Sequence, residues 1–590
     1  MRPEQDQAMG GTAVMAPPAE VCPGPVRSTS APKPPGFVAR LLPSLTDVAF
    51  LMPGIIVFGR LGGANVLLGD GDTGWHLRTG QWILQNGRVP QHDIFSYTKA
   101  GQPWFAWEWL WDVVFGWMHQ NWGLAAVVLV STVLMGTVFA LVYRLALWKS
   151  HNALAAIAVT LAGLAGSSIH WLARPHLMTW LLLIVFYWLL ERAQAGETRA
   201  LYWLPPLTVL WTNLHGGFLA GLMLVGAYGA GELIAWTVET RAAEKAAALT
   251  RLRRYAAVGV ACAAASLINP YGFKLHLHIA QYLTDSSMYS GIQEFLGYSF
   301  QHPMAKFVEA MLLLAAIAVG WNIYRRRFAY AIIVVIWAHA GLFSARHIPL
   351  LMIVIAPIVA VMVAELAALV SVAEVAAWVR RAARGFERLA SDIGAVERIG
   401  RIPLVSAAAV ILLVVMVRLE ASDKFRAEFD AKRFPAGAVN AIPGAELASG
   451  VFTSDQWGDY LIYRLYPNVK VFIDGRSDFY GSQFADRYID AMNGKWNWEK
   501  VLDRYHVKTV LLPVGASLAS TLKESAGWRV RYDDHVAIVF QRAGLETRAS
   551  LALPEGMQAP AVTNGGFTAV ARPQTPKPVV SGPQSYARRK

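Results

Sequence analysis

A series of apolar segments constrains this chain more than any other feature, because most of them approach the length that crosses a bilayer. A spanning helix needs roughly 20 mostly apolar residues, and this 590-residue sequence is 55% hydrophobic and only 16% charged. The pattern predicts an α-helical polytopic membrane protein with about 11 transmembrane helices. We expect them near residues 45–68, 124–148, 153–172, 177–190, 201–213, 218–236, 255–268, 305–321, 328–343, 349–370 and 403–417.

Lys and Arg concentrate in alternate connections between these segments. By the positive-inside rule such connections are cytoplasmic, so the formal net charge of +13 reports orientation and not a nucleic-acid partner. The rule places the N-terminus inside, and it places the loop 69–123 and everything after residue 417 outside. The basic residues are Arg192 and Arg199; Arg241, Lys245, Arg251, Arg253 and Arg254; Arg325, Arg326 and Arg327; and Arg380, Arg381, Arg384, Arg388, Arg398 and Arg401.

Composition divides the chain into four parts. Residues 1–43 and 546–590 are rich in Pro and small residues and are predicted to be disordered tails, the first of them cytoplasmic. Residues 44–418 form the transmembrane domain, with external loops at 69–123 and 270–303. Residues 419–545 alternate short apolar runs, at 451–454, 469–474, 507–513 and 536–540, with helical stretches. This order predicts an extracytoplasmic α/β domain with a mostly parallel sheet, in which Asp455, Asp459, Asp474 and Arg476 are expected to cap helices.

The loop 69–123 interleaves Trp with ionisable residues, which suits short helices lying at the membrane surface. Other polar motifs fall on the same outer side: ARPH at 173–176, NLHGG at 213–217 and RHIP at 346–349. The centres of the expected spans are almost free of ionisable groups, whereas a transporter places polar groups near the midplane. The distribution therefore predicts chemistry at the outer membrane surface.

Asp70-Gly71-Asp72 in the first external loop, followed by interfacial helices, many spans and an external α/β domain, resembles the GT-C class of membrane glycosyltransferases. Members include protein mannosyltransferases, lipid A aminoarabinose transferases and oligosaccharyltransferase catalytic subunits. SDQWGDYL at 454–461 is similar to the Trp-Trp-Asp-Tyr-Gly segment of oligosaccharyltransferases, except that Gly458 interrupts the match. WHLRTG, ARPH, NLHGG and RHIP resemble motifs of uncharacterised bacterial membrane proteins.

The resemblance implies a bacterial inner-membrane enzyme with a periplasmic α/β domain. Such an enzyme moves a sugar from a polyprenyl-phosphate carrier to a glycan, lipid or protein acceptor, with inversion. Two other functions stay open: a transporter or flippase for lipid-linked glycans, and a non-catalytic scaffold of the same fold.

Inverting sugar transfer needs a carboxylate that takes the proton from the acceptor hydroxyl. Asp72 and Asp70 are the candidate catalytic residues. Two neighbouring carboxylates raise one another's pKa or share a divalent cation, so Asp70 and Asp72 are also the candidate ligands for Mg²⁺ or Mn²⁺. The alternative is that Asp72 or Thr73 caps a helix that begins at Trp75.

The reaction also needs donors that hold the leaving phosphate. Arg grips a phosphate through its planar fork, and His adds a donor. The alternatives are headgroup contact for Arg78, a structural hydrogen bond for His215 and interfacial packing for Glu108. Glu294 is a further candidate, in an external loop that could act as a lid. The candidate substrate-binding residues are Arg78, His76, Glu108, Arg174, His176, His215, Arg346 and His347.

The predicted orientation can be tested with a reporter that is active only outside the cytoplasm. It should work when fused after Leu545 and fail when fused near Arg326, because the basic loops are retained inside. The opposite pattern would place the acidic loop in the cytoplasm and remove the predicted active face.

Overall fold

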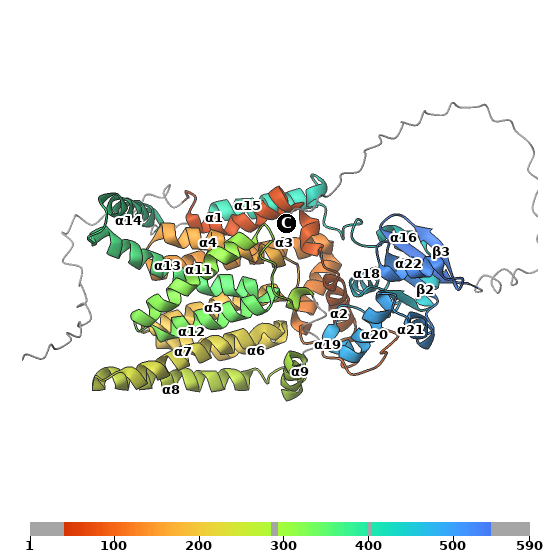
Figure 1. Ribbon diagram of the computed structural model, residues 1–590, viewed down its shortest axis with the longest axis horizontal. Coiled ribbons are helices and arrows are strands. Elements are labelled where there is room, and N and C mark those ends of the chain that lie inside the picture. Colours follow the sequence, from red (N-terminus) through yellow and green to blue (C-terminus); the bar gives the residue numbers. More distant parts are fainter. Residues whose placement is uncertain (1–40, 285–292, 398–402, 544–590) are drawn as a thin grey trace, which may run out of the picture. The chain divides into compact units, whose positions relative to one another are not determined.

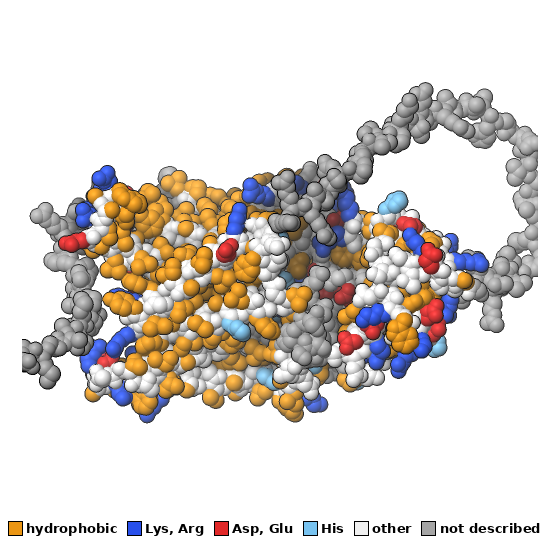
Figure 2. Space-filling view, in the orientation of Figure 1, with side chains coloured by type: hydrophobic (Ala, Val, Ile, Leu, Met, Phe, Trp, Pro, Cys, Tyr) orange, Lys and Arg blue, Asp and Glu red, His pale blue; other side chains and the backbone are white. Residues whose placement is uncertain are grey.

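Long helices pack side by side through most of the computed structural model, which describes residues 41–284, 293–397 and 403–543 (Figure 1). In these ranges six helices are long and apolar enough to cross a membrane. They are α3 (Trp109–Ser150), α4 (Ala153–Ser167, continued by a turn to His170), α5 (His176–Gln194), α7 (Leu219–Val238), α11 (Ala305–Tyr324) and α13 (Ile348–Val372). Hydrophobic side chains cover much of their visible surface (Figure 2).

The predicted number of about eleven spans is not confirmed, because several apolar helices are short. Two of these are apolar helices of intermediate length, α12 (Phe328–Phe343) and α15 (Leu404–Arg418). The helices α1 (Leu45–Ile56) and α6 (Leu204–Leu214) have 12 and 11 residues. The first half of α8 (Ala242–Ala265) carries the predicted cytoplasmic charges. The predicted tails lie almost entirely outside the described residues.

The central helix of this part is α13. It packs against α3, α4, α11 and α12, and every side chain from Ile348 to Ala360 is buried. Small residues let other pairs of neighbouring helices approach one another closely, as is usual for helices in membranes. A Cβ on Gly136 of α3 would lie 2.5 Å from the carbonyl oxygen of Phe50 in α1, and one on Gly231 of α7 would lie 2.5 Å from the amide nitrogen of Ala329 in α12.

The loop 69–123 holds α2 (Asp72–Asn86) and the start of α3. Gly123 interrupts α3 with φ 70° and ψ −169°, at the boundary where the sequence predicts that the loop ends and the span begins. Gly80 of α2 packs on the backbone of α3, where a Cβ would lie 1.8 Å from the Asp112 carbonyl oxygen. The other side of α2 contacts α18 of the α/β part.

The α/β part contains a four-stranded sheet in the order β1-β2-β4-β3. Only β1 and β2 are parallel, and β4 is antiparallel to both β2 and β3, so the prediction of a mostly parallel sheet is wrong. Residues 469–474 form no strand; Val471 makes only isolated bridges to Ser96 and Val451. The strands are β1 (Val451–Thr453), β2 (Thr509–Pro513), β3 (Trp528–Asp533) and β4 (Ala537–Arg542).

The helices predicted between the strands are present. They are α18 (Asp455–Leu465), α20 (Ser482–Met492), α21 (Trp498–Arg504) and α22 (Ser517–Glu524), beside the short α16 (Ala436–Ala441), α17 (Gly444–Ala448) and α19 (Ser477–Tyr480). The described residues up to Arg542 belong to one compact unit, so the boundaries at 419 and 545 stay predictions.

A buried arginine joins the α/β part to the external loop. Nη2 of Arg476 lies 2.7 Å from Asp93 Oδ1 and 2.7 Å from Asp474 Oδ2, and its guanidinium lies over the Trp104 ring at 4.4 Å. Asp474 and Arg476 therefore form an ion pair that docks the loop. Arg476 also occupies the N-cap position of α19 (Ser477–Tyr480), but its side chain makes no capping hydrogen bond. Losing one partner of a buried pair is strongly destabilising, so this contact helps to hold α2 and α18 together.

Candidate active site

The site is built around the first turn of α2. The helix begins at Asp72, its N-cap is Gly71, and Asp70 Oδ1 accepts a hydrogen bond of 2.9 Å from the Asp72 amide. Asp70 therefore takes the capping role that the sequence allowed for Asp72 or Thr73. Both carboxylates lie at the positive end of the helix dipole.

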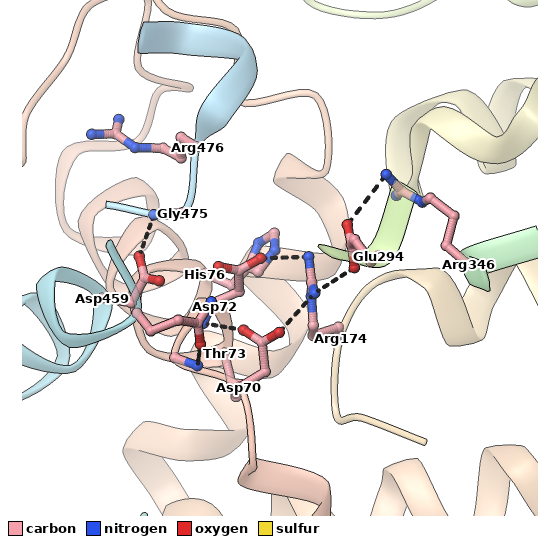
Figure 3. Close-up of polar contacts among 12 residues, drawn as sticks. Asp70, Asp72, Thr73, His76, Arg174, Glu294, Arg346, Asp459, Gly475 and Arg476 are labelled. Carbon is pink, nitrogen blue, oxygen red and sulfur yellow. Dashed lines mark hydrogen bonds and ion pairs between the residues drawn. The ribbon is translucent and has the colours of Figure 1, made fainter. Parts of the chain in front are cut away.

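Arg174 bridges these two carboxylates (Figure 3). Its Nη1 lies 3.0 Å from Asp70 Oδ2 and 3.4 Å from Glu294 Oε2, and its Nη2 contacts Asp72 Oδ2. Arg174 precedes α5, in the connection after α4. Three segments far apart in the sequence thus meet at one guanidinium, which supplies the charge that buried carboxylates require.

Glu294 continues the chain of ion pairs to Arg346. Arg346 Nη1 lies 3.3 Å from Glu294 Oε1, and its guanidinium lies 4.7 Å from the centre of the Phe295 ring. Burial acts to raise the pKa of Glu294, but the positive charges of Arg346 and Arg174 outweigh it and hold this pKa at about 2. Glu294 is therefore ionised, and Arg346 stands at the end of an alternating row of charges.

Asp459 of α18 reaches the same place from the α/β part. Its Oδ1 accepts a hydrogen bond of 2.8 Å from the Gly475 amide. A Cβ on Gly475 would lie 2.0 Å from Asp72 Oδ1 and 2.9 Å from Asp459 Oδ2, so both oxygens face the bare Gly475 backbone. Neither oxygen has a hydrogen-bond partner among the described residues, although both are buried. A single proton between the two carboxyl groups would satisfy both oxygens.

Burial and the surrounding charges together place the pKa of Asp72 near neutral pH. Burial raises the pKa of Asp72 to about 7, with Arg174 opposing the rise and Asp70 and Glu294 adding to it. Burial and the charge of Asp72 raise the pKa of Asp459 well above its ordinary value. The two carboxyl groups are therefore coupled and titrate as a pair, and the pKa of Asp72 lies near neutral pH.

A second polar pair lies where α3 begins. His215 Nε2 is 3.7 Å from Glu108 Oε1. The Gly217 amide donates to His215 Nδ1 at 3.0 Å and Thr179 Oγ1 lies 2.8 Å from the same atom. Since Nδ1 accepts, the neutral ring carries its proton on Nε2, facing Glu108.

Burial dominates the protonation of this pair. Burial, followed by the charge of Asp478, raises the pKa of Glu108 to about 8. Burial, followed by the charges of Arg346 and Arg174, lowers the pKa of His215 to about 3. At neutral pH the pair therefore offers a protonated carboxyl and a neutral imidazole, both of which can donate to a ligand hydroxyl.

The other predicted site residues form no ion pair with this row of charges within the described ranges. His76 Nδ1 is hydrogen-bonded to Asp112 Oδ1 at 2.7 Å, between α2 and α3. Arg78 Nε donates to the Tyr463 carbonyl at 2.8 Å and so joins α2 to α18. His176 Nε2 lies 3.2 Å from the His170 carbonyl. His347 Nδ1 is buried, and no described residue hydrogen-bonds to it.

The sequence left open a divalent cation shared by Asp70 and Asp72. Within the described ranges no group of three or more His, Cys, Asp or Glu side chains is placed to hold a metal ion. The guanidinium of Arg174 takes the place between Asp70 Oδ2 and Asp72 Oδ2 that a cation would occupy. The chemistry proposed below therefore uses no metal.

Sequence reasoning missed the contribution of α18. It expected Asp459 to cap a helix, but the N-cap of α18 is Ser454. The available signal was Gly458, which interrupts the motif at 454–461. A Cβ there would lie 2.0 Å from the Ile473 carbonyl oxygen, so only glycine lets α18 approach the segment that carries Gly475.

No family model matches this chain, and no curated protein sequence matches it. Among solved structures it is similar to the crystal structure of the Archaeoglobus fulgidus oligosaccharyltransferase in complex with Zn and sulfate. The two are 13% identical, the match covers 85% of this chain and 73% of that chain, and the TM-score is 0.45. An oligosaccharyltransferase is a GT-C enzyme, the class that the sequence resembles.

The contact at Gly475 can be tested by adding one methyl group. Gly475→Ala places a Cβ against Asp72 Oδ1 and Asp459 Oδ2, so α18 must move and the environment of Asp72 must change. We expect a loss of at least about tenfold in the activity of the site, since small displacements of catalytic groups are costly. The matched control is Gly515→Ala, which meets no heavy atom within 4 Å. Equal activity in the two variants would show that Asp459 and Asp72 need no close contact.

Proposed function

We propose that this chain is a membrane glycosyltransferase that moves a sugar from a polyprenyl-phosphate carrier to a glycan, lipid or protein acceptor. The reaction takes place at the outer face of the bacterial inner membrane, with inversion and with Asp72 as the general base. The observation that carries the proposal is the buried carboxyl of Asp72, whose pKa is raised to about 7 at the start of α2 beside Arg174. A general base works best when its pKa lies near the operating pH.

The proposed step transfers one proton and one sugar. The acceptor hydroxyl gives its proton to the Asp72 carboxylate while its oxygen attacks the anomeric carbon. The bond between that carbon and the phosphate oxygen breaks, and the phosphate leaves with the bonding electrons. Because attack and departure occur on opposite faces, the anomeric configuration inverts. Asp72 then returns its proton to water.

Arginines next to the base support the second requirement of the reaction, which is to hold the leaving phosphate. Arg346 has one carboxylate partner within the described ranges, Glu294, so its fork keeps donors for a phosphate oxygen. Arg174 has three carboxylate partners and is better suited to holding Asp72 than to binding the carrier. We assign phosphate binding to Arg346 and positioning to Arg174. Glu108 and His215 are assigned to a hydroxyl of the sugar or acceptor.

Substitutions at the two first-loop aspartates test the assignment of the base. Asp72→Asn keeps the size of the side chain and its contact with Arg174 but cannot accept a proton. We expect glycan transfer to fall by about a hundred- to ten-thousand-fold, at matched membrane levels and with carrier binding retained. Asp70→Asn should cost less, because Asp70 acts through Arg174 and the helix start. A loss at Asp70 as large as at Asp72 would favour a metal held by the pair.

The control for these variants is Asp423→Asn. The side chain of Asp423 is 97% exposed, so this variant should leave transfer unchanged. Full activity in Asp72→Asn would eliminate Asp72 as the base. A transporter, a flippase or a scaffold predicts no transfer by the wild-type protein, so the wild-type assay separates these functions from the proposed one.

The pH dependence follows from the raised pKa. Asp72 must be a carboxylate to take a proton, so the transfer rate should rise with pH through about 7 and level off above it. Glu108 also titrates near this range, at about 8, so the profile is to be measured in Glu108→Gln as well. The rise through pH 7 should persist in that variant. A profile that loses this rise in Glu108→Gln would assign the base to Glu108.

A further inference from the structure

The helix α14 (Ala377–Glu397) lies at the opposite end of the long helices from the acidic site (Figure 1). It follows α13 after four residues, and Arg384 Nε donates to the Ser371 carbonyl near the end of α13 at 2.9 Å. Because α13 is long enough to span the membrane, a helix tied to its last turn is held at the level of the membrane surface.

One face of α14 is fixed to the protein. Ala390, Gly394 and Glu397 are buried, and the helix packs against α4 and α13. Glu397 Oε1 accepts a hydrogen bond of 3.0 Å from the Leu45 amide at the start of α1, and its Oε2 lies 3.4 Å from Tyr143 of α3. These contacts determine which sides of α14 face away from the other helices.

The sides that face away form two adjacent stripes. Trp378, Ala382 and Leu389 are exposed and follow one another at spacings that share a helical face, with 72% of Trp378 and 53% of Leu389 accessible. Arg381, Arg384 and Arg388 are exposed at spacings of three and four, which makes a cationic stripe beside the apolar one. Figure 2 shows basic and hydrophobic side chains together in this region.

The cationic stripe has no carboxylate partner among the described residues, although Arg384 donates to the Ser371 carbonyl. Asp392 is the one acidic side chain near the boundary of the two stripes within the described ranges. An exposed Trp next to arginines without carboxylate partners suits the interface of a bilayer. There the ring lies at headgroup level and the arginines meet lipid phosphates.

We propose that α14 is an interfacial helix that binds anionic phospholipids of the leaflet on this side of the membrane. The stripe of Trp378 and Leu389 lies among the upper acyl chains. The stripe of Arg381, Arg384 and Arg388 holds the phosphate groups of anionic headgroups, since guanidinium groups near a charged leaflet are attracted to it. This assignment is independent of the reaction proposed above.

The test uses the full chain in nanodiscs that contain phosphatidylcholine and phosphatidylglycerol, with retained lipids counted by native mass spectrometry. The wild-type protein should retain phosphatidylglycerol preferentially. The triple variant R381Q/R384Q/R388Q should lose this preference by on the order of tenfold, and the matching triple Arg→Lys variant should keep most of it because the charge remains. The control is R253Q/R254Q, which removes two exposed arginines of α8 and should change the preference little.

A second measurement locates the apolar stripe. The full chain with Leu389→Cys, Cys22→Ser and Cys262→Ala carries a fluorophore at residue 389, and brominated acyl chains should quench it. The proposal is overturned if the wild-type protein shows no preference for phosphatidylglycerol, if the control variant loses as much as the triple variant, or if the label is not quenched. An unquenched label would indicate that the stripe is covered by protein instead.

Discussion

The candidate active site depends on the contact of one guanidinium, that of Arg174, with three carboxylates. Asp70, Asp72 and Glu294 lie close together and largely out of water, where unpaired carboxylates would each take up a proton. The positive charge of Arg174 opposes this protonation and lets the three acids lie close together. The contact also fixes the start of α2 against the connection before α5 and the segment before α11. The arrangement of the external segments and the charge state of the candidate base therefore follow from the same interaction.

The α/β part completes this site because glycines on α2 allow α18 to approach closely. A Cβ on Gly71 would lie 2.3 Å from the Gln456 carbonyl oxygen, and one on Gly74 would lie 2.7 Å from the Asp459 carbonyl oxygen, so α2 and α18 approach as closely as paired helices in membranes. This approach brings Asp459 beside Asp72, although they are far apart in the sequence. The protonation of Asp72 thus depends on the docking of the α/β part, which the buried ion pair of Arg476 with Asp93 supports.

Hydrophobic length and the distribution of arginines were sufficient to predict the long helices and the grouping of Arg174 and Arg346 with Asp70 and Asp72. These residues share one end of the spans, so their proximity follows from periodicity and orientation. The position of His76 did not follow, because the side of α2 that meets α3 depends on the contact at Gly80. The antiparallel pairing of β3 and β4 was also missed, although Trp528–Asp533 alternates apolar and charged residues in the period-2 pattern that marks a half-buried strand. Asp459 could not be placed without knowing that Gly458 lies against the backbone of Ile473 and Asp474.

The two first-loop aspartates differ in a way that only their partners explain. Asp70 Oδ1 accepts the Asp72 amide and Asp70 Oδ2 meets Arg174, so both of its oxygens are committed to holding the structure. Asp72 has one oxygen on Arg174, while its Oδ1 faces Asp459 and the bare backbone of Gly475. A proton bound at Asp72 Oδ1 would leave Oδ2 in contact with Arg174 while removing the negative charge of this pair. This difference in contacts separates a structural acid from a reactive one within a three-residue motif.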